Sequence, residues 1–259
     1  MENYIKNFEL FNEIIVYDFN IFNGGIGDCI KFYMYILNLC IRDNKRLYYK
    51  KNNILIENYI KLKYEILYIH NEKILNNYTI VNPKMFYDKI NNNYCENNYG
   101  YFINIGDVFY FSDEIINNSL LIFPKSISNY ISIHLRLGDK FLEINDKKLK
   151  KIIDKKKDIR YFSLEQIDKI VEENKDENIF FCCDNNSFRQ QIKDKYNNII
   201  ITNGEIGHTS YLITSPKQIL DSLTELYLLS KSKKIYAASS SGFSIVAANF
   251  NNIPYIKLY

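Results

Sequence analysis

Short apolar runs alternate along the chain with segments in which apolar residues recur three and four positions apart. Runs rich in Ile, Val, Tyr and Phe, typical of buried strands, occupy residues 14–17, 47–49, 130–135, 179–183, 199–201, 235–238 and 254–258. Helical spacing begins near residues 26, 164, 188, 216 and 242. Because strand and helix alternate, we expect parallel sheets with helices on both faces. The pattern leaves the order of elements open within residues 52–125, where Asn clusters interrupt the apolar runs.

Two of the predicted helices have clear start signals. Gln166 follows Ser163 at the spacing of a capping box. Ser215 precedes Pro216, which favours Ser as the N-cap and Pro as the first helical residue. We expect the second of these helices to reach about residue 230, with Asp221 and Glu225 displaced from its apolar stripe. The lysine-rich stretch at 146–158 is expected to be a solvated loop or an exposed helix.

Two turns rich in glycine or serine, one in each half of the chain, follow predicted strands and open predicted helices. This repetition predicts an α/β protein with two Rossmann-like lobes whose parallel sheets face a cleft. We place one lobe at residues 1–125 and the other at residues 126–259. Ligands of such sheets bind beyond the carboxyl ends of the strands, so a functional site is expected at these turns.

Composition excludes several classes of protein. With 47% hydrophobic and 24% charged residues, the 259-residue chain has the composition of a folded globular protein. A net charge of +3 does not indicate nucleic-acid binding. The five Cys residues are scattered, and we expect small buried hydrophobes in a reducing compartment rather than disulfides. His70, His134 and His208 lie far apart in the sequence and form no recognisable metal motif, so no metal is expected.

No apolar stretch reaches the length of a membrane span. The apolar segment at residues 30–41 is short, and Lys31 and Asn38 interrupt it. The first residues lack the basic region and apolar run of a signal peptide. The sequence therefore predicts a soluble, cytoplasmic protein.

The first motif is the run Gly-Gly-Ile-Gly-Asp at residues 24–28, at the start of a helix. Gly25 and Gly27 let a ligand approach the backbone, and the N–H groups of a helix start favour an anion. A tight turn that needs glycine for its dihedral angles is the alternative. The charge of Asp28 would repel a phosphate, so Asp28 fits better as a base or as the partner of a hydroxyl group.

The second motif is a polar cluster at the end of a predicted strand. His134 and Arg136 alternate in the strand and therefore point to the same side. Arg offers a planar fork of donors suited to two phosphate oxygens. Gly138 opens the turn, and Asp139 can brace Arg136 or His134. A buried polar network that stabilises the strand end is the alternative, which we consider weaker.

Two further motifs follow later strands. Asp184 ends the strand at residues 179–183 and can accept hydrogen bonds from a purine or a ribose hydroxyl, or else cap a helix. Ser239, Ser240 and Ser241 precede a helix, where hydroxyl and N–H groups can cradle a diphosphate, or merely cap that helix. Asp221 either reaches the same cleft or lies on the solvent face of its helix.

Together these motifs resemble the fucosyltransferase superfamily with the GT-B fold, which spans α1,2-, α1,6- and protein O-fucosyltransferases. The matching stretches are residues 24–28 with the helix that follows, 133–139, 161–184 and 218–250, in the family's order. The resemblance implies that residues 1–125 form the acceptor side and that residues 126–259 bind a nucleotide sugar.

The resemblance also implies roles for individual residues. Arg136 would contact the β-phosphate of the donor, with His134 nearby, and Asp184 would contact guanine or ribose. Asp221 and the serines at 239–241 correspond to the family's Asp-containing helix and phosphate turn. Leu137 stands where α1,6-type enzymes carry a second Arg, so donor contacts are expected to be fewer here. Asp28 stands where many members have Asn after the glycines.

The implied activity is an inverting transfer that needs neither an obligatory metal nor a cofactor. Fucose, or a related sugar, would pass from GDP-fucose or another nucleotide sugar to a hydroxyl group of a glycan or protein. Arg136 would stabilise the charge that develops on the leaving phosphate. Asp28 is the candidate general base.

Other protein families share parts of this sequence pattern. Bacterial heptosyltransferases resemble the chain at residues 25–28 and 239–259, and polysaccharide pyruvyltransferases share the glycine-rich start. Neither family matches residues 134–140 as well as the fucosyltransferases do. A non-catalytic descendant that binds a nucleotide or a glycan without turnover is the alternative outside the enzymes.

Overall fold

The chain divides into two compact units, Met1–Ser112 and Asp113–Tyr259. The structure is a computed structural model that describes residues 1–19, 24–50, 57–69, 75–82, 103–143, 158–208 and 214–259. The division falls before α6 (Asp113–Ile122), whereas the sequence pattern placed it after residue 125. The physical reason is that α6 packs against α10 (Pro216–Leu229), where Asn118 donates hydrogen bonds to Asp221 Oδ1 and Thr224 Oγ1 at 3.0 and 2.9 Å.

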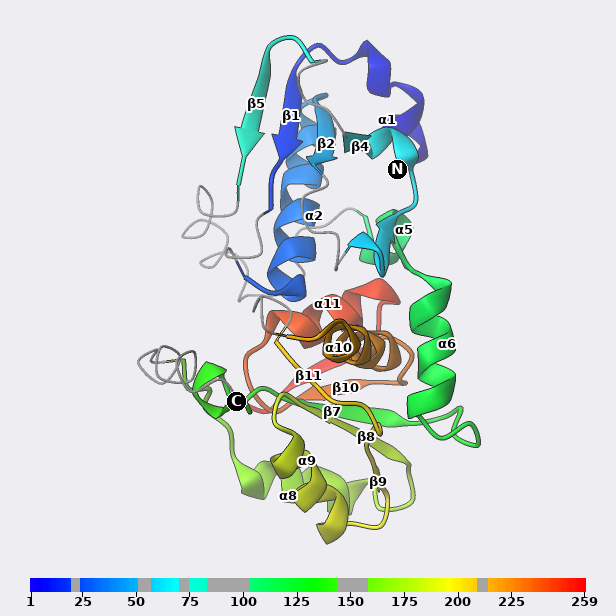
Figure 1. The fold of residues 1–259 in the computed structure, drawn as a ribbon, viewed down its shortest axis with the longest axis vertical. Coiled ribbons are helices and arrows are strands. Elements are labelled where there is room, and N and C mark those ends of the chain that lie inside the picture. The colour runs from blue at the N-terminus through cyan, green and yellow to red at the C-terminus, as the bar shows by residue number, and fades with distance from the viewer. Residues whose placement is uncertain (20–23, 51–56, 70–74, 83–102, 144–157, 209–213) are drawn as a thin grey trace. The chain divides into compact units, whose positions relative to one another are not determined.

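The first unit is built on a four-stranded parallel sheet with the order β4-β2-β1-β5 (Figure 1). Its strands are β1 (Ile14–Tyr17), β2 (Arg46–Lys50), β4 (Tyr68–Ile69) and β5 (Tyr78–Val81). The helix α2 (Ile26–Arg42) connects β1 to β2, as the spacing of apolar residues predicts. The unit also contains α1 (Glu2–Lys6), η1 (Phe8–Leu10), η3 (Glu65–Leu67), α5 (Ile105–Val108) and the antiparallel pair β3 (Ile60–Leu62) and β6 (Phe109–Phe111).

Aromatic side chains fill the core of the first unit. Tyr33 of α2 contacts Tyr17, Tyr49 and Phe109 edge to face, with ring centroids 5.4 to 5.7 Å apart. Tyr17 and Tyr33 are fully buried. These contacts anchor α2, and hence the glycine turn before it, to the sheet.

The second unit is built on a five-stranded parallel sheet with the order β11-β10-β7-β8-β9. Its strands are β7 (Ile131–Leu135), β8 (Ile179–Cys183), β9 (Ile199–Ile200), β10 (Ile235–Ala237) and β11 (Tyr255–Lys257). Its further helices are η6 (Asp139–Phe141), α8 (Leu164–Glu173), α9 (Asn186–Lys195) and α11 (Gly242–Phe250). The predicted strands and helices of this half are therefore confirmed within one to two residues at most ends.

Helices cover both faces of this sheet, with α8 and α9 on one side and α10 and α11 on the other (Figure 1). Because successive side chains of a strand point to opposite faces, Ile131, Ile133 and Leu135 pack in one core with the buried residues of α8 and α9. His134 points to the other face and stacks on Phe243 of α11. The sheet thus directs His134 away from the core shared with α8 and α9.

Local sequence explains where the helices begin. The Ser215 hydroxyl accepts from the Gln218 N–H at 3.1 Å, and the Gln218 side chain accepts from the Ser215 N–H at 3.0 Å, which completes a capping box before Pro216. The Ser163 hydroxyl accepts from the Gln166 N–H at 3.3 Å. Both predicted N-caps are confirmed.

Other expectations concern the cysteines, the membrane and the lysine-rich stretch. Cys29, Cys40, Cys182 and Cys183 are buried and unbridged, as expected, and Cys95 lies outside the described residues. Within the described ranges, no helix has the length and apolar content to cross a membrane. The lysine-rich stretch falls almost entirely on residues 144–157, which also lie outside the described part.

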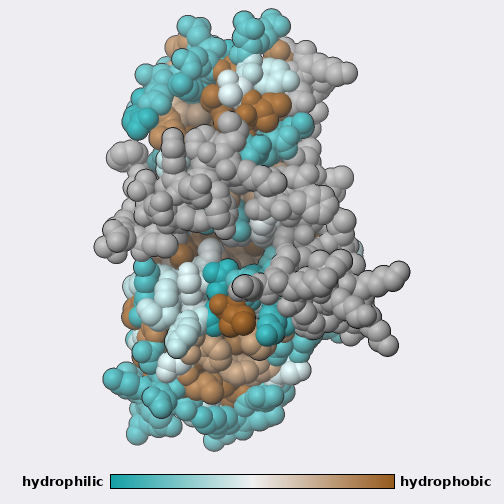
Figure 2. All heavy atoms as spheres, turned by 90° about the vertical axis from the view of Figure 1, so that its left-hand side faces the viewer, coloured by the Kyte–Doolittle hydropathy of each residue, from teal (hydrophilic) through white to brown (hydrophobic). Residues whose placement is uncertain are grey.

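Apolar side chains break the polar surface of the second unit beside the end of β7. In the lower part of Figure 2, hydrophobic residues of this unit form a patch, with hydrophilic residues along part of its edge. The large exposed hydrophobic side chains of this unit include Phe141, Ile159, Tyr161 and Leu164. Because Phe141 shares η6 with Asp139 and Ile159 follows Asp158, apolar surface adjoins the polar cluster described next.

Candidate functional site

The sheet of the second unit reverses its winding between β7 and β10. β8 and β9 lie on one side of this point and β11 lies on the other. In open α/β sheets, ligands bind beyond the carboxyl ends of the strands at such a point. Arg136 follows β7, and Ser239 follows β10 after one intervening residue. The Ser239 hydroxyl donates to the Arg136 carbonyl and accepts from the Arg136 N–H, both at 2.8 Å. This reciprocal pair fixes the backbone of Arg136 at the switch point.

The turn after β7 is held by the residue that ends β8. Asp184 accepts hydrogen bonds from the N–H groups of Leu137 at 2.8 Å and Gly138 at 3.3 Å. Gly138 has a φ of 105°, and a Cβ there would lie 2.3 Å from the Asp158 carbonyl oxygen. Glycine is therefore required at 138 both by the backbone angle and by the close approach of the chain at 158. Burial raises the pKa of the Asp184 carboxyl, although Arg136 and the two N–H donors oppose this.

The guanidinium group of Arg136 has its partners on one terminal nitrogen. Nη2 donates to Asp139 Oδ1 at 2.7 Å and to His208 Nε2 at 3.1 Å, with Asp158 Oδ2 at 3.4 Å. Asp139 and Asp158 are joined through the Asp139 N–H, which donates to Asp158 Oδ2 at 3.3 Å. The prediction that Asp139 braces Arg136 is thus matched by a direct contact.

The same guanidinium group retains hydrogen-bonding capacity. Burial would lower the pKa of Arg136, but the carboxylates of Asp184, Asp139 and Asp158 outweigh it and raise that pKa, so the side chain remains cationic. No described residue accepts a hydrogen bond from Arg136 Nε, although this atom is buried. A buried N–H group without a partner is costly, and a bound anion would remove that cost.

His134 lies beside this cation in a neutral form. Its side chain is buried at 4% exposure and stacks on Phe243, with ring centroids 5.6 Å apart. Burial, together with the charge of Arg136, lowers the pKa of His134 to about 3. Nδ1 of this ring is buried and has no partner among the described residues. A neutral imidazole and a cationic guanidinium thus present two unsatisfied nitrogens at one strand end.

The three serines after β10 differ in their surroundings. Ser239 is buried and forms the two hydrogen bonds with the Arg136 backbone described above, while Ser240 is exposed. Ser241 is the N-cap of α11, and its hydroxyl accepts from the Phe243 N–H at 3.3 Å. The expected serine-rich cap is therefore present at Ser241, and a contact of Ser240 with a phosphate stays a prediction.

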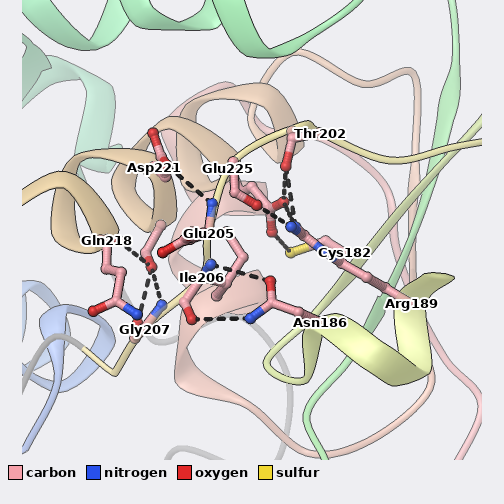
Figure 3. A network of polar contacts seen from close by, with 12 residues as sticks. Cys182, Asn186, Arg189, Thr202, Glu205, Ile206, Gly207, Gln218, Asp221 and Glu225 are labelled. Carbon is pink, nitrogen blue, oxygen red and sulfur yellow. Dashed lines mark hydrogen bonds and ion pairs between the residues drawn. The ribbon is translucent and has the colours of Figure 1, made fainter. Parts of the chain in front are cut away.

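Asp221 is buried rather than solvent-facing, at 1% exposure on α10. Its Oδ2 accepts from the Glu205 N–H at 3.0 Å, and it also pairs with Lys217. Behind it, Arg189 of α9 forms a buried ion pair with Glu225 of α10 at 2.7 Å (Figure 3). Asp221 therefore holds the loop that follows β9, and a contact with the donor stays a prediction.

The glycine motif of the first unit follows β1, which adjoins the switch point of its own sheet. Gly24 has a φ of 140°, and a Cβ there would lie 2.4 Å from Asp28 Oδ2, so glycine is required. Gly25 is the N-cap of α2, and its carbonyl accepts from the Asp28 and Cys29 N–H groups at 3.1 and 3.0 Å. Gly27 is buried in the first turn, and Asp28 pairs with Lys31 at 3.1 Å. The expected tight turn is present, and ligand contacts here stay predictions.

The second unit brings together most of the residues singled out by sequence. They are His134, Arg136, Asp139, Asp184 and Ser239, which form one cluster of contacts at the ends of β7, β8 and β10. Sequence reasoning missed Asp158 and His208, which contact Arg136 from 22 and 72 residues away. No local signal marks either residue. In the described part of the chain, no group of three or more His, Cys, Asp or Glu side chains is arranged to hold a metal ion.

At the level of sequence, the chain matches no protein-family model and no curated protein. Its three-dimensional structure is similar to solved fucosyltransferases. NodZ alpha-1,6-fucosyltransferase soaked with GDP-fucose has a TM-score of 0.57 at 11% identity, over 92% of this chain and 93% of that chain. Fucosyltransferase NodZ from Bradyrhizobium has a TM-score of 0.57 at 12% identity, over 91% of both chains.

A plant protein has a similar TM-score. A mutant of Arabidopsis thaliana FUT1 in complex with GDP has a TM-score of 0.56 at 12% identity, over 100% of this chain and 75% of that chain. The chain therefore has a fucosyltransferase-like fold, and the predicted α/β architecture with parallel sheets of the GT-B type is confirmed. At sequence identities this low, the structural similarity establishes the fold alone. The activity has to be argued from the chemistry of the site.

Proposed function

We propose that the chain is a glycosyltransferase that transfers fucose from GDP-fucose to a hydroxyl group of a glycan or protein. The observation that carries the proposal is Arg136, a partly buried cation whose buried Nε has no partner among the described residues, at the switch point of the sheet. A diphosphate supplies the negative charge and the acceptor oxygens that this group lacks. NodZ structures obtained with GDP and GDP-fucose support guanosine diphosphate as the nucleotide.

The residues of the cluster have different proposed roles around the diphosphate. Arg136 is proposed to bind the β-phosphate, with His134 as a neutral neighbour that can donate or accept one hydrogen bond. Asp184 and Ser239 hold the backbone on either side of Arg136. We assign Asp139 the role of a brace, because it occupies the Nη2 side of the guanidinium.

The proposed reaction needs one bond exchange at the anomeric carbon. The acceptor hydroxyl oxygen forms a bond to that carbon with inversion, while the bond from carbon to the β-phosphate oxygen breaks and GDP leaves with the electron pair. Arg136 stabilises the charge that grows on this oxygen, an effect worth about 10²–10³-fold in rate in comparable sites. The hydroxyl proton passes to a base, for which we propose Asp28.

A turnover assay tests the proposal. Release of GDP from GDP-fucose is measured with water and with a panel of glycans as acceptors, and UDP-glucose serves as the mismatched donor. We expect release from GDP-fucose only, and we expect Arg136→Ala to lower the rate by about 10²-fold or more. Asp28→Asn should lower the rate while GDP affinity stays within about twofold, since a base acts only in the transition state.

Two results would count against the proposal in different ways. A folded protein that binds GDP but turns over no donor would favour the non-catalytic alternative. An unchanged rate for Asp28→Asn would remove Asp28 as the base and leave the role of Arg136 intact.

A further inference from the structure

The loop Gly204–His208 lies between β9 and α10 and has no regular secondary structure. The backbone of each of its residues nevertheless forms a hydrogen bond with a side chain. Arg189 donates to the Gly204 carbonyl, and Asp221 accepts from the Glu205 N–H. Asn186 pairs with both the N–H and the carbonyl of Ile206 (Figure 3). The remaining partners are the Ser222 hydroxyl, which bonds both backbone groups of Gly207, and the Thr214 hydroxyl, which donates to the His208 carbonyl at 2.7 Å.

The fit of this loop against α10 is close. A Cβ at Gly204 would lie 2.9 Å from the Asp221 side chain, and one at Gly207 would lie 2.5 Å from Thr214 Cγ2. Four of the five partners lie on α9 and α10, and Thr214 precedes α10. Arg189, Asp221, Ser222 and Thr214 are buried, and Arg189 also forms the ion pair with Glu225. Ordering a loop residue costs about 1–2 kcal/mol of backbone entropy, so a segment bound at each residue indicates that its position matters.

His208 is the residue that this loop presents to Arg136. Its Nε2 lies 3.1 Å from Arg136 Nη2 and 3.7 Å from Asp139 Oδ1. Arginine has only donors, so Nε2 is the acceptor in this contact and carries no proton. The imidazole and Asp139 together occupy Nη2, which leaves Nε of the same planar group for an external acceptor.

We propose that His208 is a positioning residue of the anion site, and that the bound loop exists to hold its ring against Arg136. The inference rests on the proposed function for the identity of the anion, a diphosphate. It adds a residue from the loop after β9 to the cluster at the ends of β7, β8 and β10.

The test separates positioning from binding with two measurements on the full chain. Arg42, Arg46, Arg136, Arg160 and Arg189 are the arginines of the sequence, so the Nε–H NMR signal of Arg136 can be assigned by its loss in Arg136→Lys. We expect His208→Ala to broaden this signal and to weaken GDP binding about tenfold, with little change for guanosine. His208→Gln, whose amide oxygen can accept from Nη2, should restore both the signal and the affinity.

A matched control and a folding check complete the design. Glu205→Ala changes an exposed side chain of the same loop and should leave both measurements as in the wild type. Melting temperatures show whether each variant is folded. An unchanged Arg136 signal and unchanged GDP affinity in folded His208→Ala would overturn the inference, as would a failure of His208→Gln to rescue. If the wild type binds no GDP while its Arg136 signal depends on His208, the positioning role stands and the proposed function fails.

Discussion

Two neighbouring side chains at the end of β7 differ in charge, since Arg136 is a cation and His134 is neutral. Arg136 keeps its charge because three carboxylates surround it, and His134 stays neutral because it is buried beside that charge. A bound anion would therefore pair with one positive charge, that of Arg136, and not with a second charge on His134. A single charge pair suits a ligand that must be released after the reaction.

The neutral state of His134 predicts a pH dependence of stability. The folded-state pKa of about 3 lies below the unfolded value of 6.5, so the unfolded chain binds the proton first and stability falls as pH drops through this window. From pH 6.5 to pH 4 this single group should cost about 3 kcal/mol of the free energy of unfolding. Urea unfolding of His134→Phe across the same range should show a shallower decline than the wild type. Parallel curves for the two proteins would contradict the assignment.

At the scale of elements, α9, α10 and the chain after β9 are joined by one buried network. Glu225 accepts from Arg189 at 2.7 Å and from Cys182 Sγ at 3.0 Å, and it also bonds Thr202. Burial raises the pKa of the Glu225 carboxyl, against the pull of Arg189. This network anchors the loop that presents His208, since Arg189 also binds the Gly204 carbonyl.

The network predicts an asymmetry between single and double substitutions. Arg189→Met leaves a buried carboxylate without its cation and should lower the free energy of unfolding by about 3–5 kcal/mol. Arg189→Met combined with Glu225→Leu removes both charges and should lose clearly less. Denaturant titration of the wild type, Arg189→Met, Glu225→Leu and the double variant checks this. A double variant whose loss equals the sum of the two single losses would show that the two charges do not interact.

The same network shows what a sequence pattern misses at this scale. Apolar periodicity and caps located the strands and helices of the second unit, because those signals are local. Asp221 and Glu225 lie off the apolar stripe of α10 and were expected to be displaced from the core, yet both are 1% exposed. Their burial depends on partners in α6, α9 and the loop after β9, and no local pattern encodes such contacts. For the same reason the sequence does not mark Asp158 or His208 as partners of Arg136.

At the scale of the whole molecule, each of the two units has a parallel sheet with a polar turn at its switch point. The predicted architecture followed from the repetition of these turns. The sequence does not predict the order of elements within residues 52–125. The strands described there, β3 to β6, have two to four residues each and are too short for a periodic signal. The division at 112 rather than 125 came from the packing of α6 on α10, again a long-range contact.

Arg136 is the group proposed to bind the diphosphate, and a calorimetric titration with GDP tests this role. Arg136→Lys keeps the charge but loses the planar fork, and Arg42→Ala removes an exposed arginine of the first unit as the matched control. We predict that folded Arg136→Lys binds GDP at least about 30-fold more weakly than the wild type, while Arg42→Ala is unchanged and guanosine affinity is the same in all three. Equal GDP affinity in the wild type and Arg136→Lys would contradict this role of Arg136.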